Sequence, residues 1–193
     1  MSEKQKPELP EGFSLLAEFN AGSGEAFSRI VDEHSARLIN FLFRYTRDHA
    51  AAEDLAQEAF LRLYRSASDL KPGARLSTIL YRIAYNLAVD LSRRKKARGG
   101  ELSLDAAAAA AAGAEPAAPA GSGPEALYER ARAGEKIEEA FLSLPAAQRL
   151  ALTLKVYEDR SYDEIAAVME TSVSAVESLL FRARQSLAKK LNK

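Results

Sequence analysis

The sequence contains no cysteine and only two histidines, His34 and His49, among its 193 residues. Without cysteine there is no disulfide framework and no thiolate chemistry, which fits a reducing cytoplasm. The two histidines show none of the spacings that hold a metal, and His34 lies on an apolar stripe typical of a packed residue. No glycine-rich phosphate loop is present. These absences argue against an enzyme, and we expect neither a metal nor a cofactor.

Long hydrophobic runs are also absent, since no apolar stretch approaches the roughly 20 residues that a membrane span needs. The polar start MSEKQKPELP does not resemble a signal peptide. We therefore expect no membrane insertion and a cytoplasmic location. Apolar residues make up 47% of the chain and charged residues 28%, which is typical of a globular protein of one domain or two small ones.

The formal net charge of zero hides an asymmetry along the chain. Residues 25–98 carry 14 basic against 9 acidic side chains, whereas residues 134–193 carry 9 of each. If the protein binds nucleic acid, the stronger attraction comes from the first half.

Residues 78–98 form a predicted helix with two different faces. Its inward face repeats at helical spacing through Leu80, Ile83, Ala84, Leu87 and Leu91. The other face and the basic end consist of Arg82, Tyr85, Asn86, Val89, Arg93, Arg94, Lys95, Lys96 and Arg98. Aromatic and amide groups suit bases, and cations suit phosphates. An ordinary amphipathic helix with a solvated basic end would show the same pattern, so this helix alone leaves both interpretations open.

The periodicity of the whole chain predicts an all-α fold with two small helical domains. Residues 1–24 are a lead that is frayed or holds one short helix, and residues 25–98 form the first domain. Residues 99–124 contain seven consecutive alanines followed by several prolines and glycines, which predicts a flexible linker. Residues 125–193 form the second domain. Within the first domain, residues 50–67 form a helix with an acidic flank, and residues 66–77 form a loop.

The second domain ends in a predicted helix-turn-helix. Ser161, Tyr162, Asp163 and Glu164 have the pattern of a capping box that opens a short helix. After a turn, Ser172 is placed to cap a longer helix with an apolar face. A helical hairpin in an all-α core would give the same pattern without DNA, but the capping box, tight turn and C-terminal position together favour DNA.

Three groups of residues are informative together. The first comprises Ala52, Glu53, Asp54, Leu55, Gln57, Glu58, Ala59, Phe60, Leu61, Arg62 and Leu63. The second comprises Leu80, Tyr81, Arg82, Ile83, Ala84, Asn86, Leu87, Ala88, Asp90, Arg93 and Arg94. The third comprises Leu144, Pro145, Gln148, Arg149, Ser161 to Ala166 and Phe181 to Arg184. Together they resemble the extracytoplasmic-function (ECF) subfamily of bacterial sigma-70 factors: the first group resembles its polymerase-binding helix, the second its −10 helix and the third its −35 module.

The resemblance implies a transcription initiation factor that binds core RNA polymerase and directs it to −10 and −35 promoter elements, under stress or envelope-signal control. Polymerase contacts, to the clamp helices of the beta-prime subunit, are implied for Asp54, Leu55, Gln57, Glu58 and Phe60. Contacts to the −10 element are implied for Lys71, Arg75, Arg82, Tyr85, Asn86, Arg93 and Arg94. Contacts to the −35 element are implied for Ser172, Ser174, Ala175, Glu177, Ser178, Phe181 and Arg182. The flap of the beta subunit and an anti-sigma factor are further implied partners.

The sequence departs from the family pattern at several positions. Ile79 stands where the family usually has tryptophan, which predicts weaker or altered strand opening. Ser174 and Ala175 replace a usual glycine-threonine pair, and Glu177 and Leu179 replace basic residues. Loss of these cations lowers phosphate attraction, while the Glu177 carboxylate could accept a hydrogen bond from a cytosine amino group or simply repel phosphate.

Two other classes of protein remain as alternatives. A stand-alone helix-turn-helix regulator would bind an operator as a dimer and need no polymerase, although no coiled-coil seam is present. An adaptor without a DNA role is the third possibility, and the basic run at residues 93–98 argues against it. Dependence of DNA binding on polymerase separates the first two classes.

Overall fold

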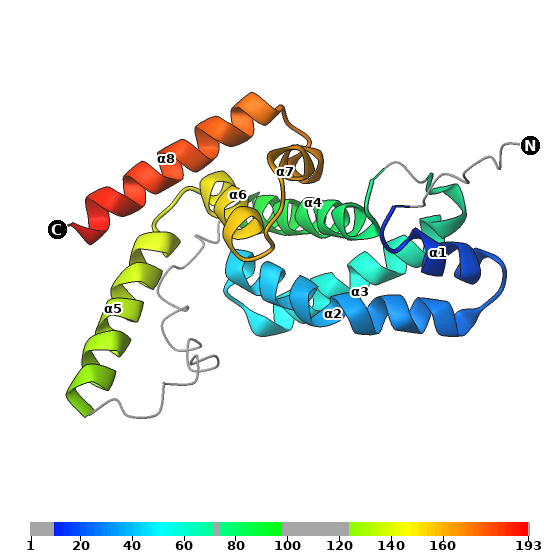
Figure 1. The fold of residues 1–193 in the computed structure, drawn as a ribbon, viewed down its shortest axis with the longest axis horizontal. Coiled ribbons are helices and arrows are strands. Elements are labelled where there is room, and N and C mark those ends of the chain that lie inside the picture. Colours follow the sequence, from blue (N-terminus) through cyan, green and yellow to red (C-terminus); the bar gives the residue numbers. More distant parts are fainter. Residues whose placement is uncertain (1–9, 72–73, 98–123, 193) are drawn as a thin grey trace, which may run out of the picture. The chain divides into compact units, whose positions relative to one another are not determined.

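The computed structural model describes residues 10–71, 74–97 and 124–192, and every regular element in these ranges is a helix (Figure 1). The chain divides into two compact units, Met1–Gly99 and Gly100–Lys193. The predicted all-α fold is therefore confirmed. The predicted linker lies outside the described residues except for Pro124, which begins the first helix of the second unit. A proline suits this position because a first-turn N–H has no partner within the helix.

The first unit consists of α1 (Phe13–Asn20), α2 (Gly24–Thr46), α3 (His49–Ser66), the 3₁₀ turn η1 (Ala67–Asp69) and α4 (Leu76–Ala97). Helices α2, α3 and α4 pack pairwise against one another, and α1 packs on α2 and η1 (Figure 1). The fully buried large side chains of this unit are Leu16, Ile30, Leu38, Phe41, Leu42, Leu63, Leu76 and Leu80. They recur at helical spacing, so each helix buries one stripe.

Capping side chains fix where the helices of the first unit begin. The Ser23 side chain accepts from the Ala26 amide at 3.3 Å, and Asp48 accepts from the Ala51 amide at 3.1 Å. Each bond satisfies an amide that has no partner within the helix. Aspartate and serine are among the residue types preferred at this cap position. Helix α4 begins at Leu76, two residues before the predicted start.

The structure describes residues 10–24 of the predicted lead. These residues include α1, whose Phe13, Leu15 and Leu16 are buried. The ring of Phe19 also lies 5.0 Å from that of Phe27 and 4.9 Å from that of Tyr64, between centroids. Of the two alternatives for the lead, the structure has the short helix, and that helix is part of the first unit.

The second unit consists of α5 (Pro124–Leu142), α6 (Ala146–Val156), α7 (Tyr162–Met169) and α8 (Val173–Leu191). Helix α8 packs against the other three, and its Val176, Leu180 and Ala183 are buried. The large fully buried side chains of this unit are Leu150, Leu154, Ile165 and Leu180. Tyr157 and Leu191 are 51% and 44% exposed, although their spacing continues the apolar stripes of α6 and α8. Tyr157 follows the last residue of α6, and Leu191 is the last residue of α8.

The predicted helix-turn-helix is present as α7, a turn and α8. Ser161 and Glu164 form the predicted capping box, in which each side chain accepts from the other residue's backbone amide. Glu170 ends α7 in the left-handed conformation, with φ 52°. The Ser172 side chain then accepts from the Ala175 amide at 3.2 Å and opens α8.

Candidate functional sites

The acidic flank of α3 is exposed on the surface of the first unit. Asp54 and Gln57 are exposed, whereas Leu55 and Glu58 are half-buried. Glu58 Oε1 accepts a hydrogen bond from Arg62 Nε at 2.9 Å, one helical turn further on. The flank therefore offers two acids and an amide on a rigid element, and an apolar side chain adjoins them.

Phe60 is not part of this exposed flank. Its side chain is only 8% exposed because it faces the core beside Ala59 and Leu63. A contact of Phe60 with polymerase stays a prediction. Leu61, by contrast, is 49% exposed and lies one turn beyond Gln57 on the same side of α3. Leu61 was not among the predicted site residues. A signal was available, since Leu61 falls outside the apolar stripe of its own helix.

The face of α4 that carries Arg82, Tyr85 and Asn86, here called the α4 front, combines half-buried and exposed side chains. Arg82, Tyr85 and Asn86 are half-buried, whereas Arg93 and Arg94 near its C-terminal end are exposed. Lys71 and Arg75, which precede the helix, are exposed as well. The middle of this face is thus held by packing, while the exposed cations at its two ends can contact a phosphate backbone.

Ile79 and Tyr81 lie on the buried side of α4, at 7% and 3% exposure. The Tyr81 ring packs edge-on against Phe41 with 5.0 Å between centroids. Ile79, the departure from the family pattern, is therefore a core residue here. Its effect on strand opening stays a prediction, and the burial indicates that it would act through packing.

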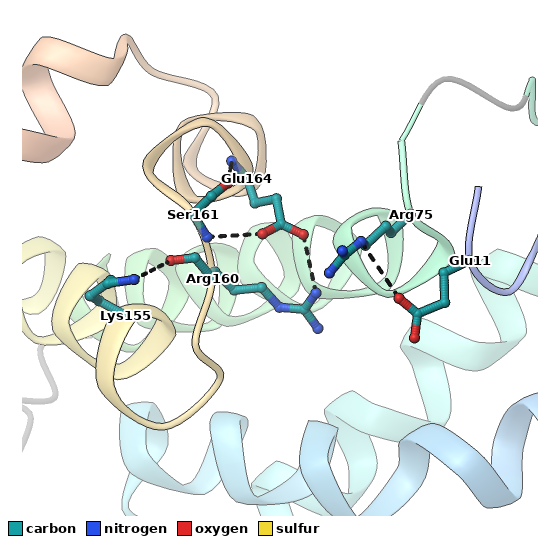
Figure 2. Close-up of polar contacts among 6 residues, drawn as sticks. All are labelled: Glu11, Arg75, Lys155, Arg160, Ser161 and Glu164. Atoms are coloured by element: carbon teal, nitrogen blue, oxygen red, sulfur yellow. Dashed lines mark hydrogen bonds and ion pairs between the residues drawn. The ribbon is translucent and has the colours of Figure 1, made fainter.

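The N-terminal end of α4 is joined to the segment before α1. The Arg75 guanidinium Nε lies 3.5 Å from the Glu11 carboxylate (Figure 2). The Leu76 amide donates to the Glu11 carbonyl oxygen at 3.0 Å. Arg75 is thus a predicted DNA ligand that already has an acidic neighbour within its own unit.

The early turns of α8 present most of the predicted −35 residues to solvent. Ser172, Ser174, Glu177, Ser178, Phe181 and Arg182 are exposed, and Ala175 is half-buried. Phe181 is 62% exposed, so its ring is accessible for contact with a partner. Arg182 Nε donates to the Ser178 carbonyl oxygen at 3.2 Å. Ser172 differs from the others because its hydroxyl already caps the helix.

A polar network fixes the start of α7 within the second unit (Figure 2). Glu164 Oε1 lies 3.3 Å from Arg160 Nη1, and Glu164 Oε2 accepts from the Ser161 amide at 2.9 Å. Lys155 Nζ donates to the Arg160 carbonyl oxygen at 3.1 Å. Arg160 is only 8% exposed, so this pair is better shielded from water than a surface ion pair. The network holds the first helix of the helix-turn-helix in place.

Within the described ranges, no helix is long and apolar enough to cross a membrane. No group of three acidic or histidine side chains in the same ranges is arranged to hold a metal ion.

Comparison with known proteins finds the same two modules. The family model described as Sigma-70 region 2 matches residues 30–98, and that described as Sigma-70, region 4 matches residues 134–187. The RNA polymerase sigma-H factor of Pseudomonas aeruginosa is 30% identical over 177 residues, which cover 92% of each chain. The ECF RNA polymerase sigma factor SigW of Bacillus subtilis is 31% identical over 179 residues, covering 91% of this chain and 94% of SigW. The chain belongs to the ECF subfamily of the sigma-70 family.

Solved structures agree with this fold. CnrH, in complex with the cytosolic domain of CnrY, aligns over 92% of this chain and 95% of its own with a TM-score of 0.65 at 24% identity. The sigma factor RpoE of Bartonella quintana, in complex with the anti-sigma factor NepR, gives a TM-score of 0.61 at 23% identity and covers 86% of this chain. As a sigma factor, this chain is a transcription initiation factor that acts with RNA polymerase and promoter DNA.

Proposed function

We propose that this sigma factor divides its work among three surfaces: the α3 flank binds core polymerase, the α4 front captures the −10 element, and the early turns of α8 read the −35 element. One observation carries the proposal most strongly. The chain combines a capped helix-turn-helix, whose second helix exposes one face of its first half, with a second polar helix face in a separate unit. A stand-alone regulator needs only the first of these surfaces.

The polymerase surface consists of Asp54, Gln57 and Glu58, together with the adjoining Leu55 and Leu61. Acidic side chains suit a basic partner surface, and an exposed leucine at the same place supplies apolar area to bury. We assign this surface to the clamp helices of the beta-prime subunit. The flap of the beta subunit is the proposed partner of the second unit.

The −10 surface relies on side chains whose positions are fixed before DNA arrives. Arg82, Tyr85 and Asn86 are half-buried on one helix, so little side-chain entropy remains to be lost on binding. A ring and an amide held this way suit a base that has left its stack. The exposed Lys71, Arg75, Arg93 and Arg94 supply cations for the flanking phosphates.

The −35 surface includes an acidic side chain among the residues proposed to contact bases. Glu177 is exposed one helical turn before Phe181, so both side chains project from the same side of α8. A carboxylate accepts a hydrogen bond from the amino group of cytosine, and an apolar ring packs on the methyl group of thymine. We therefore propose a −35 element with a cytosine at the Glu177 position and a nearby thymine.

A protein inhibitor of the anti-sigma kind is the proposed regulator, as in the complexes of CnrH with CnrY and of RpoE with NepR. Release of such an inhibitor by a stress or envelope signal would make the sigma factor available in the cytoplasm. An inhibitor that covers the α3 flank should compete with core polymerase, since two proteins cannot occupy that flank at once.

The experiment compares promoter binding by the protein alone with binding by its complex with core polymerase, in a gel-shift titration at fixed salt. A sigma factor should bind promoter DNA well only within the complex. Tight, operator-like binding by the protein alone would instead support the stand-alone regulator. Absence of salt-sensitive DNA binding in both arms would support the adaptor.

A further inference from the structure

Helix α1 contacts the chain on both sides of the predicted −10 ligand Lys71. At its C-terminal end, Asn20 Nδ2 donates a hydrogen bond to the Ala67 carbonyl oxygen at 3.0 Å. At its N-terminal end, the Glu11 carbonyl oxygen accepts from the Leu76 amide at 3.0 Å, and the Glu11 carboxylate lies 3.5 Å from Arg75 Nε (Figure 2). Helix α1 and the residues directly before it are therefore bonded to both η1 and the start of α4.

The second contact requires a glycine. Gly12 has φ +84°, a conformation that side chains with a Cβ rarely adopt. A Cβ added to Gly12 would also lie 2.8 Å from the Leu76 Cβ atom, closer than such atoms approach. Gly12 thus allows the backbone before α1 to lie directly against the first residue of α4.

Helix α1 is itself fixed to the core of the unit. Phe13, Leu15 and Leu16 are buried, and the ring of Phe19 contacts those of Phe27 and Tyr64. Its N-cap residue is Gly12, which has no capping side chain, so packing rather than local capping stabilises this helix. A helix anchored in this way is a rigid reference for whatever is bonded to its ends.

We propose that α1 is a positioning element for −10 recognition, acting through Asn20 and Gly12. It sets where Lys71 and Arg75 stand relative to the Arg82, Tyr85 and Asn86 face, although it need not touch DNA itself. Residues 10–20 precede the residues matched by the region 2 family model. This inference rests on the proposed function of the α4 front.

The test measures binding of the holoenzyme to a fluorescent single-stranded oligonucleotide, which carries the non-template −10 sequence of a promoter found by run-off transcription. Asn20→Ala removes one hydrogen bond and should weaken binding about three- to tenfold. Its matched control is Asn40→Ala on the exposed side of α2, which should bind as the wild type does. Core-polymerase affinity should stay within about twofold for both variants, because α3 is unchanged.

Gly12→Ala should have a larger effect, above about tenfold, because it both strains the backbone and separates α1 from α4. Its matched control is Gly24→Ala in the same unit, where an added Cβ has no atom within 4 Å. If Gly12→Ala fails to fold, Asn20→Ala decides the question alone.

Oligonucleotide binding by Asn20→Ala and a folded Gly12→Ala equal to the wild type would overturn the positioning role and leave α1 as core packing only. Equal losses of core-polymerase affinity and oligonucleotide binding would overturn it too, since they would indicate general destabilisation. A wild-type holoenzyme that does not bind the oligonucleotide would overturn the proposed function itself, and with it this inference.

Discussion

The two units present their recognition groups in opposite ways. On α4 the central candidates, Arg82, Tyr85 and Asn86, are half-buried, whereas on α8 Ser174, Glu177, Ser178 and Phe181 are exposed. The packing of several helices fixes the positions of the half-buried side chains. The exposed side chains are positioned only by their own helix and its cap. The difference suggests a division of labour: a prearranged surface suits capture of an unstacked base, and an exposed helix suits entry into a groove.

The largest expected effect is on the stability of the second unit, through a cavity in the core beneath α8. Leu180 is 1% exposed on the inner side of α8, and Leu180→Ala should lower the free energy of unfolding of the second unit by about 2–5 kcal/mol. Amide hydrogen exchange should locate the loss of protection in α6, α7 and α8. Unchanged protection there would contradict the assignment of Leu180 to this core.

The double reversal Asp54→Lys with Glu58→Lys should weaken polymerase binding at least tenfold, because two acids that face the partner become cations. The fold should survive, since Asp54 is exposed and the Glu58–Arg62 pair is solvent-accessible. The matched control reverses Asp32 and Glu33, which are exposed on α2. Equal affinities of the two double variants for core polymerase would show that the binding surface is elsewhere.

Asn86→Ala tests the half-buried surface, and we expect promoter opening to fall about tenfold while polymerase affinity is unchanged. The reason is that a lost base contact costs roughly 1–3 kcal/mol of discrimination. Permanganate reactivity of thymines in the −10 region measures opening. Promoter opening at the wild-type level would mean that this face of α4 does not contact the −10 element.

Glu177→Gln tests the exposed surface, where a substitution should change base preference without changing stability. We expect the preference for cytosine at one −35 position to fall about three- to tenfold, since the amide lacks the charge that strengthens the hydrogen bond. Transcription from a pool of −35 variants measures this preference, with Glu139→Gln on α5 as the control. A uniform gain across all sequences would instead mean that Glu177 only repels phosphate.

The smallest effect is expected from Glu11→Gln, which should change −10 oligonucleotide affinity by less than about twofold. The side chains of Glu11 and Arg75 are 78% and 55% exposed, and ion pairs that are this exposed to solvent contribute little to stability. The backbone bond from Leu76 to Glu11 is retained in this variant. A change above fivefold in fluorescence anisotropy titrations would show that the carboxylate itself governs Arg75.

The sequence predicted the elements of the fold well because their signals are local. Apolar periodicity gave the helices, and the capping roles of Asp48, Ser161 and Ser172 follow from residue types within one turn of each helix start. Phe60 and Leu61 are neighbours on α3 that differ in the same local way. Phe60 lies on the apolar stripe of its helix and is buried, whereas Leu61 lies outside that stripe and is exposed.

Contacts between residues far apart in the chain could not be predicted from the sequence. The Glu11–Leu76 and Asn20–Ala67 bonds join residues whose proximity depends on the packing of α1 against the other helices. The burial of Ile79 likewise depends on which side of α4 meets α2 and α3. Periodicity showed that α4 has two faces, and the packed structure showed which residues lie at their boundary.

Run-off transcription tests the central claim most directly. Core bacterial RNA polymerase is incubated with a pool of genomic promoter fragments, with and without this protein, and transcript starts are mapped. The account predicts discrete new start sites that require the protein and share −10 and −35 elements. An unchanged set of starts, together with operator-like DNA binding by the protein alone, would contradict it.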